Sequence, residues 1–240
     1  MDRALIGQVA IVTGAGRGIG RAIAERFAAE GAGVVLAART VSDIESVARE
    51  LDRADAHALA VPTDVTDDAA VQRLVDRAVE AFGRIDILVT AAGVASFGAV
   101  SEATTRDWDA MLAVNLRAVM TCCRAVLPPM LARRCGTIIN VASIAANRPI
   151  PGAAAYTATK AGVVGWSRVL AEELRAGGVR VGVLVPGAVD TPLWDTIPGG
   201  PDRTRMLRPE DVARAAVLMA SLPPRATLEE VTLLPAGGIL

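Results

Sequence analysis

Apolar and polar positions follow two alternating patterns along this chain, and together they predict its secondary structure. Short and almost uninterrupted apolar runs recur seven times, and such runs are typical of strands buried on both faces of a parallel sheet. Between them lie longer segments whose apolar residues have helical spacing. We expect strands near residues 8–13, 33–38, 57–61, 85–90, 136–142, 179–185 and 229–234.

Local signals place the starts of two helices. Ser42 to Glu45 has the sequence of a capping box, and Asp67 and Asp68 put negative charge where another helix begins. Because strands alternate with helices, the sequence predicts an α/β fold, in which one doubly wound domain over residues 1–240 has a parallel seven-stranded sheet flanked by helices. We expect the helices near residues 18–30, 42–51, 67–82, 106–131, 154–176 and 209–221.

One segment breaks this regularity. Residues 187–208 contain Pro192 and the run Pro198-Gly-Gly-Pro201, and they show little periodicity. Long irregular segments of this composition are mobile substrate lids in some enzymes and plain surface loops in other proteins. The sequence leaves both interpretations open.

Length and composition narrow the class of protein. A chain of 240 residues suits a single α/β domain. The mean hydropathy of +0.40 is high for a soluble protein, which fits a sheet buried on both faces and apolar subunit interfaces. The formal net charge of −1 provides no basic field for nucleic acid. Since no apolar run reaches 18 residues and no cleavable signal pattern is present, we expect no membrane span and a cytoplasmic location.

The few cysteines and the single histidine do not have the spacing of metal ligands, and we expect no metal. Cys122, Cys123 and Cys135 are interpreted as buried thiols that act as small hydrophobic residues in a reducing compartment. His57 lies near the third strand, where we expect a structural or surface role.

A glycine-rich loop joins the first strand to the first helix. Gly14-Ala-Gly16-Arg17-Gly18-Ile-Gly20 directly follows Thr13, the last residue of an apolar run, and a helical segment follows the loop. Glycines let the backbone approach a diphosphate closely, and the amides at a helix N-terminus face the anion. The spacing differs from the usual G-x-G-x-x-G, and an ordinary tight turn is the alternative. The strand, loop and helix context favours a Rossmann-type dinucleotide site.

The end of the second strand indicates which cofactor is preferred. In a Rossmann unit, an acidic residue in this region binds the ribose 2′-hydroxyl, whereas an arginine accommodates a 2′-phosphate. Here the strand ends at Ala38 and Arg39 without a carboxylate, and Arg17 in the glycine loop adds a second guanidinium. Solvated surface charges are the alternative interpretation of both arginines. We expect NADP(H) to be preferred over NAD(H).

Tyr156 and Lys160 lie four residues apart in a predicted helix, and Ser143 lies thirteen positions before Tyr156. At this spacing the two side chains leave the same helix face. A phenol titrates near ~10, and a neighbouring positive charge is expected to lower that pKa by favouring the phenolate. Ser143 can supply a hydroxyl to the same oxygen of a substrate. The pattern predicts a proton donor or acceptor for a carbonyl or alcohol group.

With these motifs the chain resembles the classical short-chain dehydrogenases/reductases over nearly its whole length. Six motifs occur in the family's order, among them a segment similar to its glycine motif and four residues that resemble its catalytic tetrad, namely Asn115, Ser143, Tyr156 and Lys160. The resemblance implies hydride transfer between a nicotinamide cofactor and a small-molecule ketone or secondary alcohol. It also implies a homodimer or homotetramer.

The resemblance further implies roles for individual residues. Tyr156 is expected to be the general acid or base, and Ser143 to orient the substrate oxygen. Lys160 is expected to lower the Tyr156 pKa and to hold the nicotinamide ribose, and Asn115 to support a water relay. Contacts to the cofactor are expected from Gly14, Arg17, Gly18, Ile19, Gly20, Arg39, Asp64, Val65, Ala92, Gly93, Tyr156, Lys160, Pro186, Gly187, Val189 and Thr191.

Two segments depart from the family pattern. Ala91 stands where the family usually has an asparagine that ties neighbouring strands together, so the departure concerns structure more than chemistry. The last strand is followed by Pro235-Ala-Gly-Gly238 instead of the frequent Asp-Gly-Gly turn, so we assign no family contacts to this end of the chain.

The residues expected around the substrate are small or apolar and favour a moderately hydrophobic ketone or secondary alcohol. They are Val94, Ala95, Ser143, Ala145, Tyr156, Leu193 and Trp194. Two other functions are possible for the same fold. One is a cofactor-binding sensor with little turnover, which would not need Ser143, Tyr156 and Lys160. The other is a lyase or epimerase, which usually has a larger substrate region.

Overall fold

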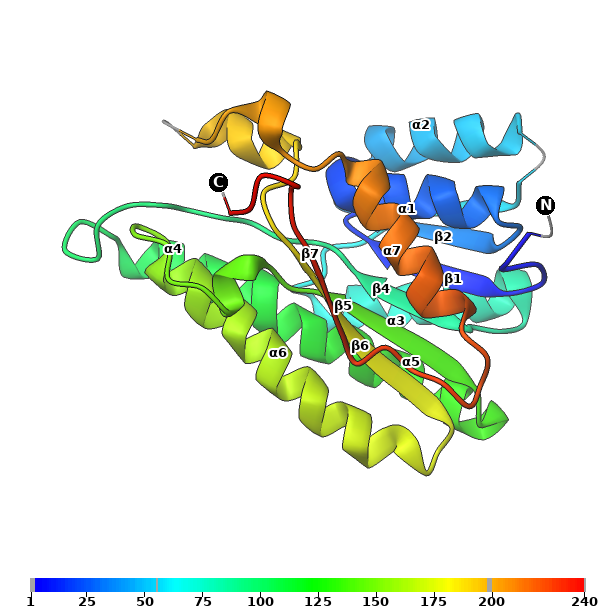
Figure 1. The fold of residues 1–240 in the computed structure, drawn as a ribbon. Coiled ribbons are helices and arrows are strands. Elements are labelled where there is room, and N and C mark those ends of the chain that lie inside the picture. Colours follow the sequence, from blue (N-terminus) through cyan, green and yellow to red (C-terminus); the bar gives the residue numbers. More distant parts are fainter. Residues whose placement is uncertain (1–2, 55, 198–199, 240) are drawn as a thin grey trace.

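Seven strands form one parallel sheet in the order β3-β2-β1-β4-β5-β6-β7. The computed structural model describes residues 3–54, 56–197 and 200–239 (Figure 1). The strands are β1 (Val9–Thr13), β2 (Gly33–Ala38), β3 (Ala58–Pro62), β4 (Ile87–Thr90), β5 (Gly136–Val141), β6 (Val179–Pro186) and β7 (Glu230–Leu233). The sequence prediction of a doubly wound α/β domain with a seven-stranded parallel sheet is confirmed.

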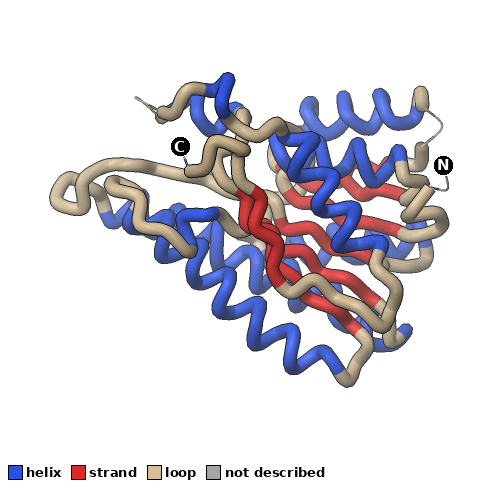
Figure 2. The backbone as a smooth tube through the Cα atoms, viewed as in Figure 1, coloured by secondary structure: helices blue, strands red, loops and turns tan. Residues whose placement is uncertain are grey.

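Helices cover both faces of the sheet (Figure 2). Buried residues of α1, α2 and α7 belong to one hydrophobic cluster, and those of α3, α5 and α6 belong to the other. The helices are α1 (Gly18–Ala29), α2 (Val41–Asp52), α3 (Asp68–Phe82), α4 (Thr105–Leu112), α5 (Ala118–Arg133), α6 (Ala154–Arg175) and α7 (Pro209–Ser221).

The strand order reverses between β1 and β4. The chain runs from β1 outward through β2 to β3, and then returns to place β4 on the other side of β1. Thr13 pairs in register with Thr90 at the carboxyl ends of these two strands. The connections that leave them diverge, and in open α/β sheets ligands bind in the crevice that such a reversal opens.

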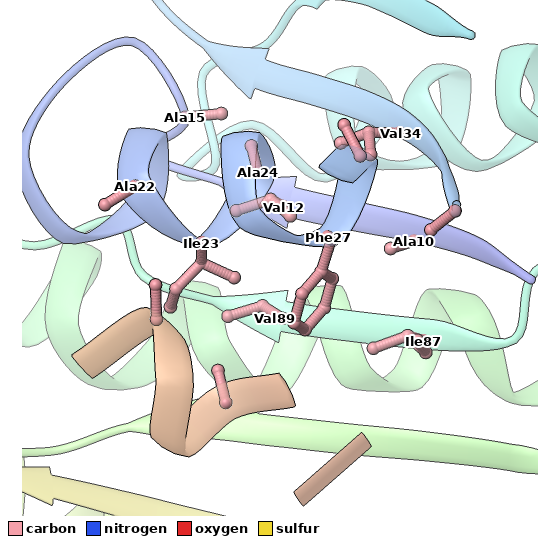
Figure 3. Close-up of a cluster of buried hydrophobic side chains, with 14 of the residues drawn as sticks. Ala10, Val12, Ala15, Ala22, Ile23, Ala24, Phe27, Val34, Ile87 and Val89 are labelled. Atoms are coloured by element: carbon pink, nitrogen blue, oxygen red, sulfur yellow. The ribbon is translucent and has the colours of Figure 1, made fainter. Parts of the chain in front are cut away.

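Helix α1 is fixed on β1 and β4 by side chains without measurable exposure. Ile23 and Phe27 extend from the helix toward Val12 and Val89 on the two strands (Figure 3). Fully burying a side chain of this size contributes about 1.5–3 kcal/mol. This packing holds the N-terminus of α1 beside the strand reversal.

The predicted helix at 106–131 is wrong as a single regular element. Helix α4 ends at Leu112, residues Ala113–Arg117 form a π-helical turn, and α5 follows directly. A π turn holds one more residue than an α turn, and such turns are frequent at functional sites. Residues of this turn keep an apolar pattern close to the helical period, so the sequence pattern does not reveal it.

Two local predictions are also wrong. Helix α2 begins at Val41 after Thr40, and the side chain of Thr40 makes no capping hydrogen bond, so the predicted capping box at Ser42 does not form. The Ser42 hydroxyl instead lies against Asp43. Cys135 is exposed because it lies in the turn after α5, whereas Cys122 and Cys123 are buried as expected.

The helical stretch Thr105–Arg133 is long and apolar enough to cross a membrane by length and composition alone. Its most apolar window is 44% buried within the domain, and core helices of soluble proteins meet the same criteria. The burial is explained by the contacts of α5 with α3 and with the central strands.

Candidate functional site

The glycine loop between β1 and α1 packs closely on the backbone of the loop after β4 and on its own backbone. Gly14 and Gly18 have φ angles of +69° and +57°, in the region that favours glycine. A Cβ atom at Gly14 would lie 2.8 Å from the backbone nitrogen of Ala92, in the loop after β4. A Cβ atom at Gly20 would overlap the carbonyl oxygen of Gly14. Side chains are therefore excluded where the loop turns into α1.

A cavity of about 280 Å³ opens above the carboxyl ends of the strands. It extends from the glycine loop and the end of β2 to Tyr156 and Lys160 on α6. Of the residues expected at a cofactor, Gly14, Arg17, Gly18, Ile19, Gly20, Arg39, Asp64, Val65, Ala92, Gly93, Tyr156, Lys160 and Thr191 line it.

Three expected cofactor residues lie outside this lining. Pro186 ends β6 and is buried, and the Gly187 amide donates to the Leu233 carbonyl at 2.8 Å. Val189 is buried and forms a bridge with Leu207. These residues hold the start of the 187–208 segment against the sheet and do not line the cavity.

Thr13 forms side-chain hydrogen bonds next to Ala91, which stands where an asparagine was expected from the resemblance. The Thr13 hydroxyl oxygen accepts hydrogen bonds from the amides of Ala91 and Ala92 at 3.1 and 3.2 Å. The buried Asn140 side chain accepts from the Thr90 hydroxyl at 2.8 Å. Strands β1, β4 and β5 are thus linked at their carboxyl ends by side chains, and the loop after β4 is held although residue 91 is alanine.

Asn115 lies within the π-helical turn and is completely buried. Its Oδ1 accepts from the Val94 amide at 2.9 Å, and its Nδ2 donates to the Val94 carbonyl at 2.8 Å. Nδ2 also lies 3.3 Å from the hydroxyl of Thr159, which donates to the Tyr156 carbonyl. Asn115 therefore joins the loop after β4 to helix α6.

Tyr156 and Ser143 come together although they lie on different elements. Ser143 caps a short 3₁₀ turn after β5, where its hydroxyl accepts from the Ala145 amide at 3.2 Å, and its side chain also hydrogen-bonds to Tyr156. Burial raises the pKa of the Tyr156 phenol, and the Ser143 hydrogen bond opposes this rise. The phenol is therefore held in its protonated form at neutral pH.

Lys160 lies one turn further along α6 and is only 5% exposed. Its Nζ donates to the Val141 carbonyl at 2.9 Å and lies 5.8 Å from the centre of the Tyr156 ring. Burial lowers the pKa of the Lys160 ammonium to about 8. The amine is directed at the Val141 carbonyl, and the pKa of Tyr156 is raised by burial, whereas we expected the charge of Lys160 to lower it.

Charged side chains gather at the far end of the cavity. Arg17 and Arg39 line it, and neither guanidinium makes a hydrogen bond or salt bridge with another residue of the described ranges. The Thr66 hydroxyl and amide hold the pKa of Asp64 below its usual range, and the charge of Arg39 adds to this effect. Two cations are thus available to an anion in this part of the cavity.

The 187–208 segment crosses the cavity at Thr191. The Thr191 side chain packs so closely on the glycine loop that a Cβ atom at Gly18 would lie 3.2 Å from its methyl carbon. Arg203 fixes this part of the segment, because its guanidinium pairs with Asp190 and Asp195 and donates to the Thr191 carbonyl. Pro198 and Gly199, within the expected lid, lie outside the described residues.

Of the residues expected around the substrate, Val94, Leu193 and Tyr156 line the cavity, whereas Ser143, Ala95, Ala145 and Trp194 do not. Trp194 stacks on Phe97, with ring centres 6.1 Å apart, and its indole donates to the Val189 carbonyl at 2.9 Å. Phe97 also faces the Tyr156 ring at 5.8 Å. Sequence reasoning missed Phe97, which lies in a loop without periodicity.

Several other cavity residues were missed. Most lie at or just after the carboxyl end of one of the strands β1 to β5, and this position is the signal that could have identified them. Asp43 lies in α2, Val114 in the π-helical turn and Pro192 in the 187–208 segment. The missed residues are Gly16, Ala38, Thr40, Asp43, Thr63, Ala91, Val114, Val141, Ala142 and Pro192.

Comparisons with proteins of known sequence identify the family. A family model described as short chain dehydrogenase matches residues 8–200. An uncharacterized oxidoreductase of Staphylococcus saprophyticus is 39% identical over 229 residues, which cover 95% of this chain and 97% of that protein. One of Staphylococcus haemolyticus is 35% identical over 231 residues, which cover 96% of this chain and 98% of that protein.

Solved structures agree with this result. A metagenomic short-chain oxidoreductase in complex with NADP has a TM-score of 0.85 and 38% identity, and the match covers 97% of this chain and 99% of that chain. A 7α-hydroxysteroid dehydrogenase complexed with NADH and 7-oxo glycochenodeoxycholic acid has a TM-score of 0.91 and 28% identity, covering 99% and 96%. The chain therefore belongs to the short-chain dehydrogenase/reductase family and is an oxidoreductase.

Proposed function

We propose that this protein is an NADP(H)-dependent oxidoreductase that interconverts a ketone and a secondary alcohol, with Tyr156 as the general acid or base. The observation that carries the proposal is the half-buried Tyr156, hydrogen-bonded to Ser143, at the end of a cavity whose other end is the glycine loop. A sensor that only bound the cofactor would not need this arrangement.

The residues that line the cavity fit a dinucleotide. Gly14, Gly18 and Gly20 leave the backbone of the loop bare, and the N-terminus of α1 directs its free amides toward the same space. Asp64, Val65 and Thr191 line the same cavity, and we assign Asp64 and Val65 to the adenine end of the cofactor and Thr191 to its middle. The nicotinamide cofactor, when bound, supplies or accepts the hydride.

Tyr156 has the protonation state that carbonyl reduction needs. Because its pKa is raised, the phenol keeps its proton at neutral pH and can donate it to a substrate oxygen. The Ser143 hydroxyl, already bonded to Tyr156, is close enough to orient that oxygen. In alcohol oxidation Tyr156 must be the phenolate to accept the proton of the substrate hydroxyl, so its raised pKa favours the reductive direction at neutral pH.

Lys160 and Asn115 are assigned supporting roles. Lys160 keeps a positive charge below its pKa of about 8, and its Nζ has one hydrogen-bond partner among the described residues, the Val141 carbonyl, so further N–H groups are free to hold the nicotinamide ribose. Asn115 joins Val94 to helix α6 through its side-chain hydrogen bonds. We propose that it keeps the loop after β4 in place and supports a proton relay from this position.

The preference for NADP(H) is supported by two guanidiniums that make no hydrogen bond or salt bridge within the described ranges. Arg17 and Arg39 line the cavity, and a 2′-phosphate would give both an anionic partner. The NADP complex of the metagenomic relative is consistent with this preference, whereas the 7α-hydroxysteroid dehydrogenase was solved with NADH. The carboxylates of Asp43 and Asp64 also line this end of the cavity and oppose the preference, although Asp64 already accepts hydrogen bonds from Thr66.

We further propose that 187–208 acts as a substrate lid and that the chain forms a homodimer or homotetramer. Thr191 touches the glycine loop from this segment, so movement of the segment would open the cofactor cavity. Leu112, Leu131 and Val169 are exposed apolar residues on α4, α5 and α6, and they are available for a subunit interface. A small-molecule substrate and a cytoplasmic location complete the proposal.

Replacing the general acid tests the proposed chemistry. Tyr156→Phe should lower the rate of NADPH-dependent ketone reduction by about 10²–10⁴-fold, the usual contribution of general acid catalysis. The affinity for NADPH, measured by fluorescence titration, should stay nearly the same because the ring remains. Thr157→Val, which removes a neighbouring buried hydroxyl without a partner among the described residues, is the control and should keep its activity. Near-normal turnover in Tyr156→Phe would overturn the assignment.

Reversing one charge tests the cofactor preference. Arg39→Asp should weaken NADPH binding by roughly 10–100-fold, because a charge-assisted hydrogen bond contributes about 1.5–3 kcal/mol, and it should leave NADH binding equal or tighter. Dissociation constants for both cofactors would be measured by fluorescence titration. Arg53→Asp, which changes an exposed arginine after α2, is the matched control. An unchanged NADPH/NADH ratio in Arg39→Asp would rule out the arginine argument.

The charge of Lys160 can be observed directly, because Lys160 is the only lysine in the chain. Protein labelled with ¹³C-lysine should give one side-chain resonance that titrates at about 8, since burial lowers the pKa from 10.5. A lowered pKa means that the ammonium is charged below this pH and neutral above it, so ketone reduction should decline as the pH rises past about 8. A resonance that titrates near the usual lysine value would contradict the buried arrangement.

A further inference from the structure

Phe97 occupies a position that the proposed chemistry does not use. It lies in the loop between β4 and α4, which projects from the same end of the sheet as the 187–208 segment (Figure 2). Its ring faces Tyr156 at 5.8 Å with a tilt of 39° and stacks on Trp194 at 6.1 Å with an angle of 20°. Phe97 is thus held between the proposed proton donor and the proposed lid.

Phe97 also lines a second cavity. It has a volume of about 200 Å³, and its wall is mixed: apolar side chains from the β4–α4 loop, α4 and the start of α6 lie beside the polar Ser96, Glu102 and Asp107. Phe97 and Ala155 line this second cavity, whereas Tyr156, next to Ala155 in sequence, lines the cofactor cavity. The apolar part of the wall consists of Phe97, Val100, Ala103, Trp108, Met111, Ala154 and Ala155.

The loop that carries Phe97 is fixed on both sides of the ring. The Gly98 amide donates to the Gly152 carbonyl at 2.9 Å, which joins this loop to the chain that enters α6. On the other side, Asn115 holds Val94 through two hydrogen bonds. Trp194 cannot turn freely because its indole donates to the Val189 carbonyl. The two aromatic pairs, with Tyr156 and with Trp194, keep the Phe97 ring in place.

From this arrangement we propose that Phe97 is the residue that limits substrate size, because its ring closes the cofactor cavity off from the second cavity. The inference rests on the proposed function and specifies its substrate class, which is a compact neutral ketone or secondary alcohol whose carbon chain ends at the Phe97 ring. Removing the ring joins the two cavities beside Tyr156 and admits a longer apolar chain. Glu102 and Asp107 in the second cavity disfavour an anionic chain.

A series of neutral methyl ketones, from 2-butanone to 2-decanone, tests this inference with NADPH as cofactor. In the native protein kcat/KM should fall as the chain outgrows the space in front of Phe97. Phe97→Ala should raise kcat/KM for 2-decanone relative to 2-butanone by roughly tenfold or more, since even one methylene group in a pocket is worth about 10–200-fold. The same variant with an unchanged profile, or a native protein that already prefers 2-decanone, would overturn the inference.

Two further variants distinguish a partition, meaning the separation of the two cavities by the Phe97 ring, from a general loss of packing in this region. Phe97→Leu keeps an apolar side chain of considerable size and removes the ring stacking, so its chain-length profile should stay close to that of the native protein. Trp108→Leu enlarges the second cavity without opening it toward Tyr156, and should change the profile only when combined with Phe97→Ala. An equal shift in all three single variants would contradict a partition at Phe97.

A binding measurement keeps this inference distinct from the proposed function. Calorimetric titration with 2-decanone should show at least a tenfold gain in affinity for Phe97→Ala, whether or not the ketone is reduced, and Phe97→Val replaces it if the alanine variant does not fold. No gain in affinity would overturn the partition. Failure of the native protein to reduce any ketone, with the gain in affinity present, would count against the proposed function and leave the partition standing.

Discussion

The pairing of β1 with β4 is the constraint on which the rest of the site depends. Because the strand order reverses at this pair, the connections after Thr13 and after Thr90 diverge, and a cavity forms where an unbroken sequence of crossovers would leave none. The glycine loop follows one strand and Ala92 follows the other, and their backbones meet at Gly14. Core packing of α1 on the same two strands sets the height of that loop above the sheet.

A second group of interactions places polar side chains where an apolar interior would otherwise exclude them. Lys160 is buried with its amine on the Val141 carbonyl, and Asn115 is buried with both ends of its amide on Val94. Buried polar groups are costly unless they are hydrogen-bonded. Each of these side chains meets that condition, and Lys160 also holds the end of β5 whereas Asn115 holds the loop after β4, so the interactions that satisfy them also determine the shape of the cavity.

Much of this arrangement could be predicted from the sequence, because it depends on regular patterns. Apolar runs gave the seven strands, and the four-residue spacing of Tyr156 and Lys160 placed both on one face of α6. Spacing could not predict the direction of the Lys160 amine, since the Val141 carbonyl that receives it is nineteen residues away. The direction of the Tyr156 pKa shift was not predicted either. Burial raises this pKa, whereas we expected the charge of Lys160 to lower it.

Other features could not be predicted from the sequence, for a different physical reason. The π-helical turn at Asn115 interrupts a helix by a single residue, which leaves the apolar pattern almost unchanged. Phe97 lies in a long loop, where no period relates sequence to contacts, and its partners Tyr156 and Trp194 come from two other parts of the chain. Tertiary contacts between irregular segments shape the substrate side of the site, and a single sequence carries little information about them.

The central claim is that this cavity transfers hydride between a nicotinamide and a carbonyl carbon. The most direct measurement is mass spectrometry of the alcohols formed from a panel of ketones with NADPH that carries deuterium on the transferable position of nicotinamide C4. The account predicts alcohols with a single deuterium on the carbinol carbon, formed in step with NADPH consumption. It would be contradicted if no ketone gave a labelled alcohol although NADPH binds, since the protein would then hold the cofactor without using its hydride.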